Sequence, residues 1–417
     1  MKGSHPRITL LGNNSGRNLG DAAILSSILE DLTKHLPDAE FYCPSVKPKW
    51  VEQHYGKQYN VKSIDVMPWT GSIRLLGIPT FRAMAKSDAA LICDGIIFGI
   101  KLFNPAFNYL ITLIFLMPWA KFCGCKMVCY NTGIGPFPGF FSKLFAKWVV
   151  GGCDLVLMRE KDSIALARAV GVTGPIELTG DSAFINPVSG DDRAVAIAAK
   201  LGIDLAKPML GVNVTSYIDT WLDKDSRVSE RERFVDTIAK GLNQAKAATN
   251  NEFQVVVFST HPMDEAVCEE LARKTNGKVV NNSDYLSHDI QAVMRRCELF
   301  VGMRFHSLIL ASAVGAPILG LNYAPKVRSY LRLLECSDYC LELAEVTPER
   351  LAQTVTRGWE NRAALKQAQQ PIIETLKRGA ARAAEIFCDR YYPSRRKSQA
   401  HSEYANGASA ERRVAKG

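Results

Sequence analysis

The chain has 417 residues, too many for one hydrophobic core, so two domains of ordinary size are expected. Hydrophobic residues make up 47% and charged residues 22%, a soluble globular composition that excludes a fibrous or wholly disordered chain. The formal charge of +9 is moderate and lies largely in the C-terminal tail, and we expect no nucleic-acid partner.

The first predicted strand, Ile8–Leu11, is apolar and ends at Gly12. A polar, glycine-containing segment follows, and a helical pattern begins at Ala22. A glycine-rich turn from strand to helix gathers backbone N–H groups and favours a bound anion, although the glycine spacing is neither that of a dinucleotide fold nor that of a P-loop. Asp21 stands where the helix begins, so it is either a substrate-facing carboxylate or an ordinary helix cap.

Strands and helices then alternate, which predicts a mainly parallel sheet with covering helices. Asp94-Gly95 follows one apolar run, and an ordered loop with two glycines, Asn131–Phe137, follows another. Arg159 comes directly after the strand Leu155–Met158. The other strands expected in this half are Glu40–Cys43, Val61–Met67, Ala89–Cys93 and Lys126–Tyr130.

An apolar run of 13 residues, Phe107–Trp119, is shorter than the roughly 20 residues that a membrane-spanning helix needs. Two interpretations stay open for it. The run is either a buried helix or an exposed apolar surface that rests on a membrane, where a lipid-linked substrate would be met.

The second half begins after a polar bridge, Asn186–Lys207, with the strand Met209–Val214 and an amphipathic helix, Glu230–Ala248. A buried strand, Gln254–Ser259, then leads directly into the polar turn that contains His261 and Asp264. Placed after a strand of an open α/β sheet, this turn is expected at the edge where ligands bind.

The stretch Leu299–Lys326 predicts a strand, a polar elbow, a tightly packed helix and a second strand. Arg304 and His306 lie on the elbow, and Lys326 follows the second strand. A guanidinium binds phosphate or carboxylate in bidentate fashion, and an imidazole exchanges a proton near neutral pH. The alternative is that Arg304 and His306 only cap the helix or pair with local carboxylates.

The C-terminal region predicts a helical segment, Glu360–Arg390, that could pack back across both domains, and a basic tail that we expect to be disordered. The tail either touches an anionic membrane surface or stays solvated. Eleven cysteines without CxxC spacing, and no apolar leader, predict reduced thiols and a cytoplasmic location. The expected organisation is a Rossmann-like domain at 1–190, another at 205–345, helices at 346–390 and a tail at 391–417.

Polar residues thus recur at strand ends, where open α/β sheets bind ligands. They are Asp21, Arg159, His261, Asp264, Arg304, His306 and Lys326. We expect two such domains to face each other across a cleft. An anionic substrate would meet the two arginines and the lysine, and a hydroxylated substrate would meet an aspartate.

Several of these segments, in their order and spacing, resemble the polysaccharide pyruvyl transferase family over roughly residues 8–330. The segments are Gly12-Asn13-Asn14 with Leu19-Gly20-Asp21-Ala22-Ala23-Ile24, Asn131-Thr132-Gly133-Ile134-Gly135-Pro136, Arg159-Glu160 with Ser163, Gly302-Met303-Arg304-Phe305-His306-Ser307, and Tyr323-Ala324-Pro325-Lys326. One departure is Asp94-Gly95-Ile96-Ile97, where family members often have a run of glycines.

The resemblance implies a two-domain fold like that of the B-type glycosyltransferases. It implies transfer of a pyruvyl group from phosphoenolpyruvate to a sugar of a surface polysaccharide or its lipid-linked precursor, which forms a cyclic ketal. Phosphoenolpyruvate and a glycan or lipid-linked acceptor are then the partners, and no cofactor or metal is needed. Peripheral membrane contact is the alternative given above for the apolar run and the basic tail, and the resemblance does not imply it. The residues implied for substrate binding are Arg159, Arg304, Lys326, Asn18, Gly133, Gly135 and His261.

In the hypothetical mechanism, His306 protonates the enol ether, and Asp21 or Asp264 orients or deprotonates the first sugar hydroxyl. Two rival functions remain. One is a B-type glycosyltransferase with a nucleotide-sugar donor, and the other is an inactive glycan-binding scaffold on the same fold.

Overall fold

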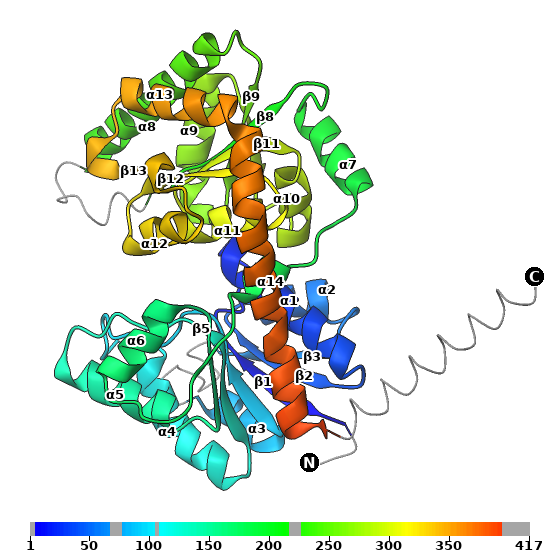
Figure 1. Cartoon of the computed structure of the whole chain (residues 1–417). Coiled ribbons are helices and arrows are strands. Elements are labelled where there is room, and N and C mark those ends of the chain that lie inside the picture. Colours follow the sequence, from blue (N-terminus) through cyan, green and yellow to red (C-terminus); the bar gives the residue numbers. More distant parts are fainter. Residues whose placement is uncertain (1–4, 67–76, 105–107, 217–226, 394–417) are drawn as a thin grey trace, which may run out of the picture. The chain divides into compact units, whose positions relative to one another are not determined.

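The computed structural model describes residues 5–66, 77–104, 108–216 and 227–393 and divides the chain into two compact units, each built around one parallel sheet (Figure 1). Unit 1 comprises Met1–Ser15, Leu25–Ser182 and Arg378–Gly417, and unit 2 comprises Gly16–Ile24 and Ala183–Lys377. The predicted basic tail lies outside the described residues from position 394 onward.

The sheet of unit 1 has seven strands in the order β3-β2-β1-β4-β5-β6-β7, and its paired strands all run parallel. The chain moves outward from β1 in one direction and from β4 in the other, so the switch point of the sheet lies between them. The strands are β1 (Arg7–Leu11), β2 (Glu40–Ser45), β3 (Val61–Asp65), β4 (Ala89–Ile92), β5 (Lys126–Thr132), β6 (Leu155–Met158) and β7 (Glu177–Leu178).

Helices connect these strands, and right-handed crossovers place the helices that follow β4 and β5 on one face of the sheet. The helices are α1 (Leu19–His35), α2 (Pro48–Tyr55), α3 (Ile78–Lys86), α4 (Leu110–Phe122), α5 (Phe140–Gly151) and α6 (Lys161–Ala169). A buried cluster that includes Ile92, Met127, Leu113 and Val149 joins β4 and β5 to α4 and α5.

The sheet of unit 2 has six parallel strands in the order β10-β9-β8-β11-β12-β13. The strands are β8 (Met209–Asn213), β9 (Gln254–Ser259), β10 (Lys278–Asn281), β11 (Cys297–Gly302), β12 (Ile318–Asn322) and β13 (Cys340–Glu342). The helices are α7 (Asp191–Leu201), α8 (Arg227–Ala248), α9 (Glu265–Thr275), α10 (Ser287–Met294), α11 (Phe305–Ala313), α12 (Pro325–Leu333), α13 (Pro348–Glu360) and α14 (Arg362–Tyr391). The predicted fold class of two α/β domains with Rossmann-like parallel sheets is confirmed.

From the sequence we expected one boundary between the domains, near the polar bridge at Asn186–Lys207. The two units are instead each made of more than one segment of the chain. Gly16–Ile24 belongs to unit 2, and hydrogen bonds to its backbone hold the segment there. The amide of Leu19 donates to the carbonyl of Thr260 at 2.9 Å, and Asn282 Nδ2 donates to the carbonyl of Arg17 at 2.9 Å. Helix α14 likewise contributes to both units. Its residues up to Lys377 belong to unit 2, and those from Arg378 onward belong to unit 1.

Helix α4 carries most of the apolar run that had two open interpretations, although Phe107 lies outside the described residues. One side of the helix is buried, with Leu113 in the core, whereas Phe115 and Trp119 are exposed. The run is therefore both a core helix and an exposed apolar surface. No helix in the described ranges combines the length and the apolar character needed to cross a membrane.

Candidate functional site

Asn213, the last residue of β8, organises the carboxyl edge of the unit 2 sheet. Its completely buried side chain donates to the carbonyl of Phe258 at 2.8 Å and to Thr260 Oγ1 at 3.3 Å. Its Oδ1 accepts the amide of Arg304 at 2.9 Å and the hydroxyl of Ser307 at 2.9 Å. One amide side chain thereby fixes the end of β9 and the elbow between β11 and α11.

Arg304 lies on that elbow, and its guanidinium forms a bidentate ion pair with Asp264. Nη2 donates to Oδ1 at 2.9 Å, and Nε donates to Oδ2. The Asp264 side chain is completely buried, whereas 11% of the Arg304 side chain reaches solvent. Thr215 Oγ1 and the Ser216 amide also donate to Asp264 Oδ1, at 2.9 and 3.1 Å. Asp264 therefore holds the guanidinium in place. Pairing of Arg304 with a nearby carboxylate was the alternative given for this residue from the sequence.

His306 lies in the first turn of α11, against Gly20 in the first turn of α1, where the glycine loop (residues 12–20) leads into that helix. An ideal Cβ built at Gly20 would overlap the ring of His306, so backbone at Gly20 packs directly on the imidazole. The loop is held there by the Leu19–Thr260 bond, and Asn18 Oδ1 accepts the amide of Gly20 at 3.0 Å. The structure thus brings together Asn18, Gly20 and His306, which lie almost 290 residues apart in the chain.

His261 belongs to the same edge and is held as one tautomer. Its Nδ1 accepts the amide of Met263 at 3.1 Å, so the ring hydrogen of the neutral form is on Nε2. Burial, followed by the positive charge of Arg304, lowers the pKa of His261 below its usual value of 6.5. His261 is therefore neutral at pH 7 and offers an N–H donor at Nε2.

Two further predicted residues belong to unit 2. Asp21, in the first turn of α1, is half-buried and adjoins the glycine that packs on His306. Lys326 is exposed in the first turn of α12, directly after β12, at the carboxyl edge of the sheet. The structure therefore places six predicted side chains at one edge of unit 2: Asn18, Asp21, His261, Asp264, Arg304 and His306, with Lys326 on a neighbouring helix.

Arg159 lies in unit 1, at the end of β6, and its side chain is only 4% exposed. Its Nη1 lies 2.8 Å from Oδ2 of Asp181, which is equally buried. An ideal Cβ at Gly133 would lie 2.7 Å from Arg159 Nη2, so the loop backbone rests on the guanidinium. Gly135, with φ +88°, turns the same loop past Leu166 in the left-handed region that glycine tolerates.

The opening glycine loop was expected to offer its free N–H groups to an anion. In unit 1, one of these N–H groups is taken by a side chain of the protein, because Asp94 Oδ2 accepts the amide of Asn13 at 2.8 Å. Asp94 is buried and adopts φ 55°, and its carbonyl accepts the amide of Gly133 at 3.1 Å. The residue that departs from the usual glycine run therefore ties the loop after β4 to the loops after β1 and β5.

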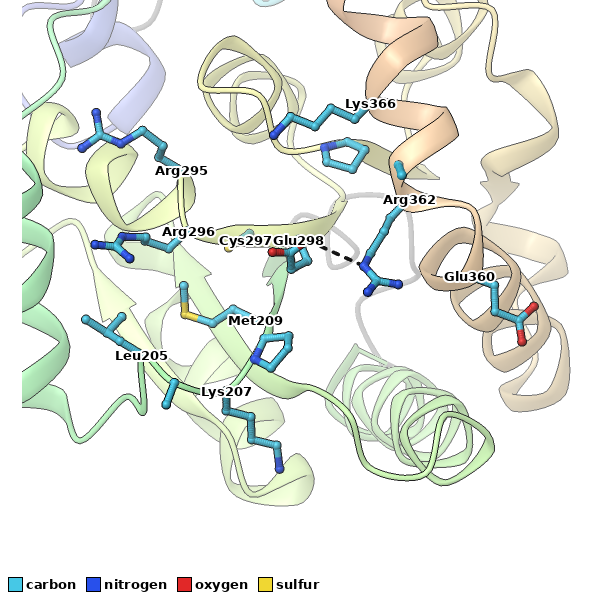
Figure 2. A pocket seen from close by; sticks show the side chains of 14 residues that line it. Leu205, Lys207, Met209, Arg295, Arg296, Cys297, Glu298, Glu360, Arg362 and Lys366 are labelled. Atoms are coloured by element: carbon cyan, nitrogen blue, oxygen red, sulfur yellow. Dashed lines mark ion pairs between the residues drawn. The ribbon is translucent and has the colours of Figure 1, made fainter.

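A cavity of about 630 Å³ lies at the opposite edge of the unit 2 sheet (Figure 2). It is lined by Met209 and Cys297, the first residues of β8 and β11, and Figure 2 shows Arg362 turned toward Glu298 across it. None of the predicted site residues lines this cavity. We therefore place the candidate site at the carboxyl edge and not in this cavity.

Asn213, Thr215, Ser216 and Asp181 are the supporting residues that sequence reasoning did not assign to the site. Asn213 ends β8, Thr215 and Ser216 come just after it, and Asp181 comes shortly after β7, so position at a strand end was an available signal. Their partners lie 40 or more positions away in the sequence, except for Asp181, which pairs across 22 positions. Such pairings depend on strand order, which a single sequence does not reveal.

A family model described as polysaccharide pyruvyl transferase matches residues 18–325 of the chain. This range contains every predicted site residue except Lys326.

Solved structures with a similar fold include a putative UDP-N-acetylglucosamine 2-epimerase from Listeria monocytogenes, with 11% identity, TM-score 0.59, and 94% of this chain and 98% of that chain covered. The Neisseria meningitidis UDP-GlcNAc 2-epimerase bound to UDP-GlcNAc gives 11% identity, TM-score 0.58, and coverage of 92% and 98%. The Anabaena protein HepE in complex with UDP and glucose gives 12% identity, TM-score 0.52, and coverage of 96% and 100%. At these identities the similarity concerns the fold, which is that of the B-type glycosyltransferases and related epimerases.

Proposed function

The chain belongs to the polysaccharide pyruvyl transferase family, and from that premise we propose that it transfers the pyruvyl group of phosphoenolpyruvate to a sugar. The product is a cyclic pyruvate ketal on a surface polysaccharide or its lipid-linked precursor. The observation that carries the proposal is the packing of His306 on the glycine loop, two residues after an arginine whose guanidinium is fixed by Asp264.

Arg304 is proposed to bind the donor. Phosphoenolpyruvate carries a phosphate and a carboxylate, and a guanidinium fixed in one orientation recognises either group with little loss of side-chain entropy. Asp264 contacts Nε and Nη2 of Arg304, and 11% of the Arg304 side chain reaches solvent. Lys326 supplies a second positive charge on α12, and His261 supplies a neutral N–H donor.

His306 is proposed as the general acid. In the reaction, a proton from His306 adds to C3 of phosphoenolpyruvate, which becomes the methyl group, while C2 becomes electrophilic. One sugar hydroxyl bonds to C2 and loses its proton. The C2–O bond to phosphate then breaks, and a second hydroxyl bonds to C2 and closes the ring. Of the two hydroxyl protons released, one replaces the proton donated to C3 and the other leaves with inorganic phosphate.

Asp21 is proposed to orient or deprotonate the first hydroxyl. Both Asp21 and Asp264 were candidates for this role from sequence. Asp264 is completely buried and both of its oxygens accept hydrogen bonds from Arg304, so we assign it to positioning that arginine. Asp21 follows the glycine that packs on His306, which favours it as the carboxylate near the acceptor.

The role of Arg159 in substrate binding stays a prediction. Its burial and its pair with Asp181 also support a structural role, in which the guanidinium packs against the loop that contains Gly133 and supports it. Gly133 and Gly135 are proposed to shape their loop through backbone geometry, and Asn18 through the bond of its side chain to the amide of Gly20.

The proposal is tested by incubating the purified chain with phosphoenolpyruvate and a panel of glycans. We expect release of phosphate and a product whose mass exceeds the acceptor by one pyruvic acid less one water. Parallel thermal-shift measurements with nucleotide sugars test the glycosyltransferase alternative. Stabilisation by a nucleotide sugar without stabilisation by phosphoenolpyruvate would overturn the proposal, and acceptor binding without phosphate release would favour the inactive scaffold.

A further inference from the structure

Unit 1 exposes a group of large aromatic side chains on and beside α4 and α5, which we call the aromatic surface. Its members are Phe103, Phe115, Trp119, Phe122, Phe140, Phe141 and Trp148. Phe122 is 87% exposed, Phe140 75% and Trp119 64%. Isolated exposed apolar residues are ordinary, but a group of this size is unusual for a surface that only meets water.

The aromatic surface is built from adjoining elements. Phe115, Trp119 and Phe122 recur at intervals of four and three residues, so they share one face of α4. On the neighbouring elements, ring centroids of Phe103 and Phe141 lie 6.2 Å apart and those of Phe140 and Phe141 lie 5.6 Å apart.

The two helices lie side by side on one face of the sheet. They pack against each other, and Lys121 Nζ near the end of α4 donates to the carbonyl of Gly152, directly after α5, at 2.7 Å. Their other sides already fill the core through Leu113, Met117 and Val149. The hydrophobic core of unit 1 therefore does not need the exposed rings.

The charged residues around the aromatic surface indicate the kind of partner that it contacts. Between Ile100 and Val150 the sequence contains five lysines and no aspartate or glutamate. Lys101, Lys143 and Lys147 are exposed among the aromatic residues. Aromatic rings favour the level of lipid headgroups, and lysines beside them are attracted to anionic lipids. A second copy of the chain is a poorer partner, because a two-fold interface would bring the same lysines face to face.

We propose that the aromatic surface docks on the face of a bilayer that contains anionic lipids. The rings enter the headgroup region while the lysines contact lipid phosphates, so the protein lies on the membrane and does not cross it. This inference does not depend on pyruvyl transfer, because docking requires neither donor nor acceptor.

The test is sedimentation of the full chain with phosphatidylcholine vesicles, with and without phosphatidylglycerol. Trp119→Ser with Phe122→Ser is compared with Val195→Ser and Leu333→Ser, which remove exposed apolar side chains from unit 2. We expect the first variant to lower affinity for anionic vesicles at least 10-fold and the control to leave it unchanged. Lys143→Gln with Lys147→Gln should reduce the preference for phosphatidylglycerol and the effect of salt.

Cys123, which follows Phe122, gives an independent readout because it is the exposed cysteine of the chain. A polarity-sensitive fluorophore on Cys123 should shift to the blue with anionic vesicles, and a Cys123→Ser protein corrects for labelling elsewhere. The proposal is overturned if the folded wild type does not bind vesicles, or if the Trp119/Phe122 variant binds as tightly as wild type. The latter result would point to the C-terminal tail. A dimer in light scattering that is lost in this variant, without vesicle binding, would instead assign the surface to a second copy.

Discussion

Nη2 of Arg304 lies 2.9 Å from Oδ1 of Asp264, a carboxylate that no solvent reaches. The pair joins the turn after β9 to the elbow after β11, and both segments are also bonded to Asn213. The arginine proposed to bind the donor is therefore positioned before any substrate arrives. Preorganisation of this kind lowers the entropy lost when an anion binds.

Asp264→Asn tests whether this carboxylate positions Arg304 or acts as a base. The amide keeps the shape of the side chain but removes the charge that holds the guanidinium. We expect kcat/KM to fall by about 10²-fold, as for other small misplacements of a binding group, with most of the change in KM for phosphoenolpyruvate. A large fall in kcat at unchanged KM would instead restore Asp264 to the role of base.

Gly20→Ala tests the contact between the glycine loop and His306. A Cβ at this position would overlap the imidazole, so the ring must move away from its place on the elbow. We expect kcat to fall by about 10²-fold, while overpacking lowers the free energy of unfolding by about 1–3 kcal/mol. Gly174→Ala is the matched control, because a Cβ at Gly174 would meet no atom within 4 Å. Wild-type kcat in Gly20→Ala would show that the contact does not serve the reaction.

The Arg159–Asp181 pair is expected to stabilise unit 1. Arg159→Met leaves the Asp181 carboxylate buried without this partner, which should lower the free energy of unfolding by about 3–5 kcal/mol. Adding Asp181→Asn should recover part of that loss, as a double-mutant cycle in urea would show. Arg350→Met removes one member of an exposed pair with Glu345 and should change stability by no more than about 1 kcal/mol. Equal losses in the two single arginine variants would refute the structural role of Arg159.

The buried carboxyl group of Asp31 should make the free energy of unfolding depend on pH. Burial in α1 raises the pKa of Asp31 to about 7, and among the described residues its Oδ2 has no hydrogen-bond partner. The folded protein therefore retains a proton that the unfolded chain releases near pH 4, so this residue makes stability fall as pH rises toward 7.

Asp31→Asn should remove that dependence. At pH 8 we expect a gain of at most about 4 kcal/mol in the free energy of unfolding, and at pH 4 little change. Urea unfolding at the two pH values measures both, with the exposed Asp284→Asn as the matched control. An equal effect of Asp31→Asn at both pH values would contradict the raised pKa.

Much of the fold could be predicted because its strands are short apolar runs bounded by polar turns. Ile8–Leu11 and Leu155–Met158 match β1 and β6 to within a residue, and the helix expected over Glu230–Ala248 begins three residues earlier as α8. The placement of Gly16–Ile24 in unit 2 could not be predicted. It depends on hydrogen bonds from Leu19 to Thr260 and from Asn282 to Arg17, which span more than 240 residues.

The candidate site was predictable in its residue types but not in its pairings. Arg304 and His306 follow a buried strand, and their chemistry suggests an anion and a proton transfer. The sequence did not reveal that Asp264 is committed to Arg304, or that Asp94 takes the amide of Asn13 in the glycine loop. Asp264, a candidate base from the sequence, and Asp94, a departure from the family pattern, each accept hydrogen bonds within the protein.

The most direct test of the proposed chemistry is the His306→Ala variant, assayed for ketal formation and for phosphoenolpyruvate binding by calorimetry. Because the proposed mechanism assigns donor binding to Arg304 and protonation to His306, the variant should bind phosphoenolpyruvate within a few-fold of wild type and form no detectable ketal. Ketal formation at the wild-type rate by His306→Ala would contradict the account.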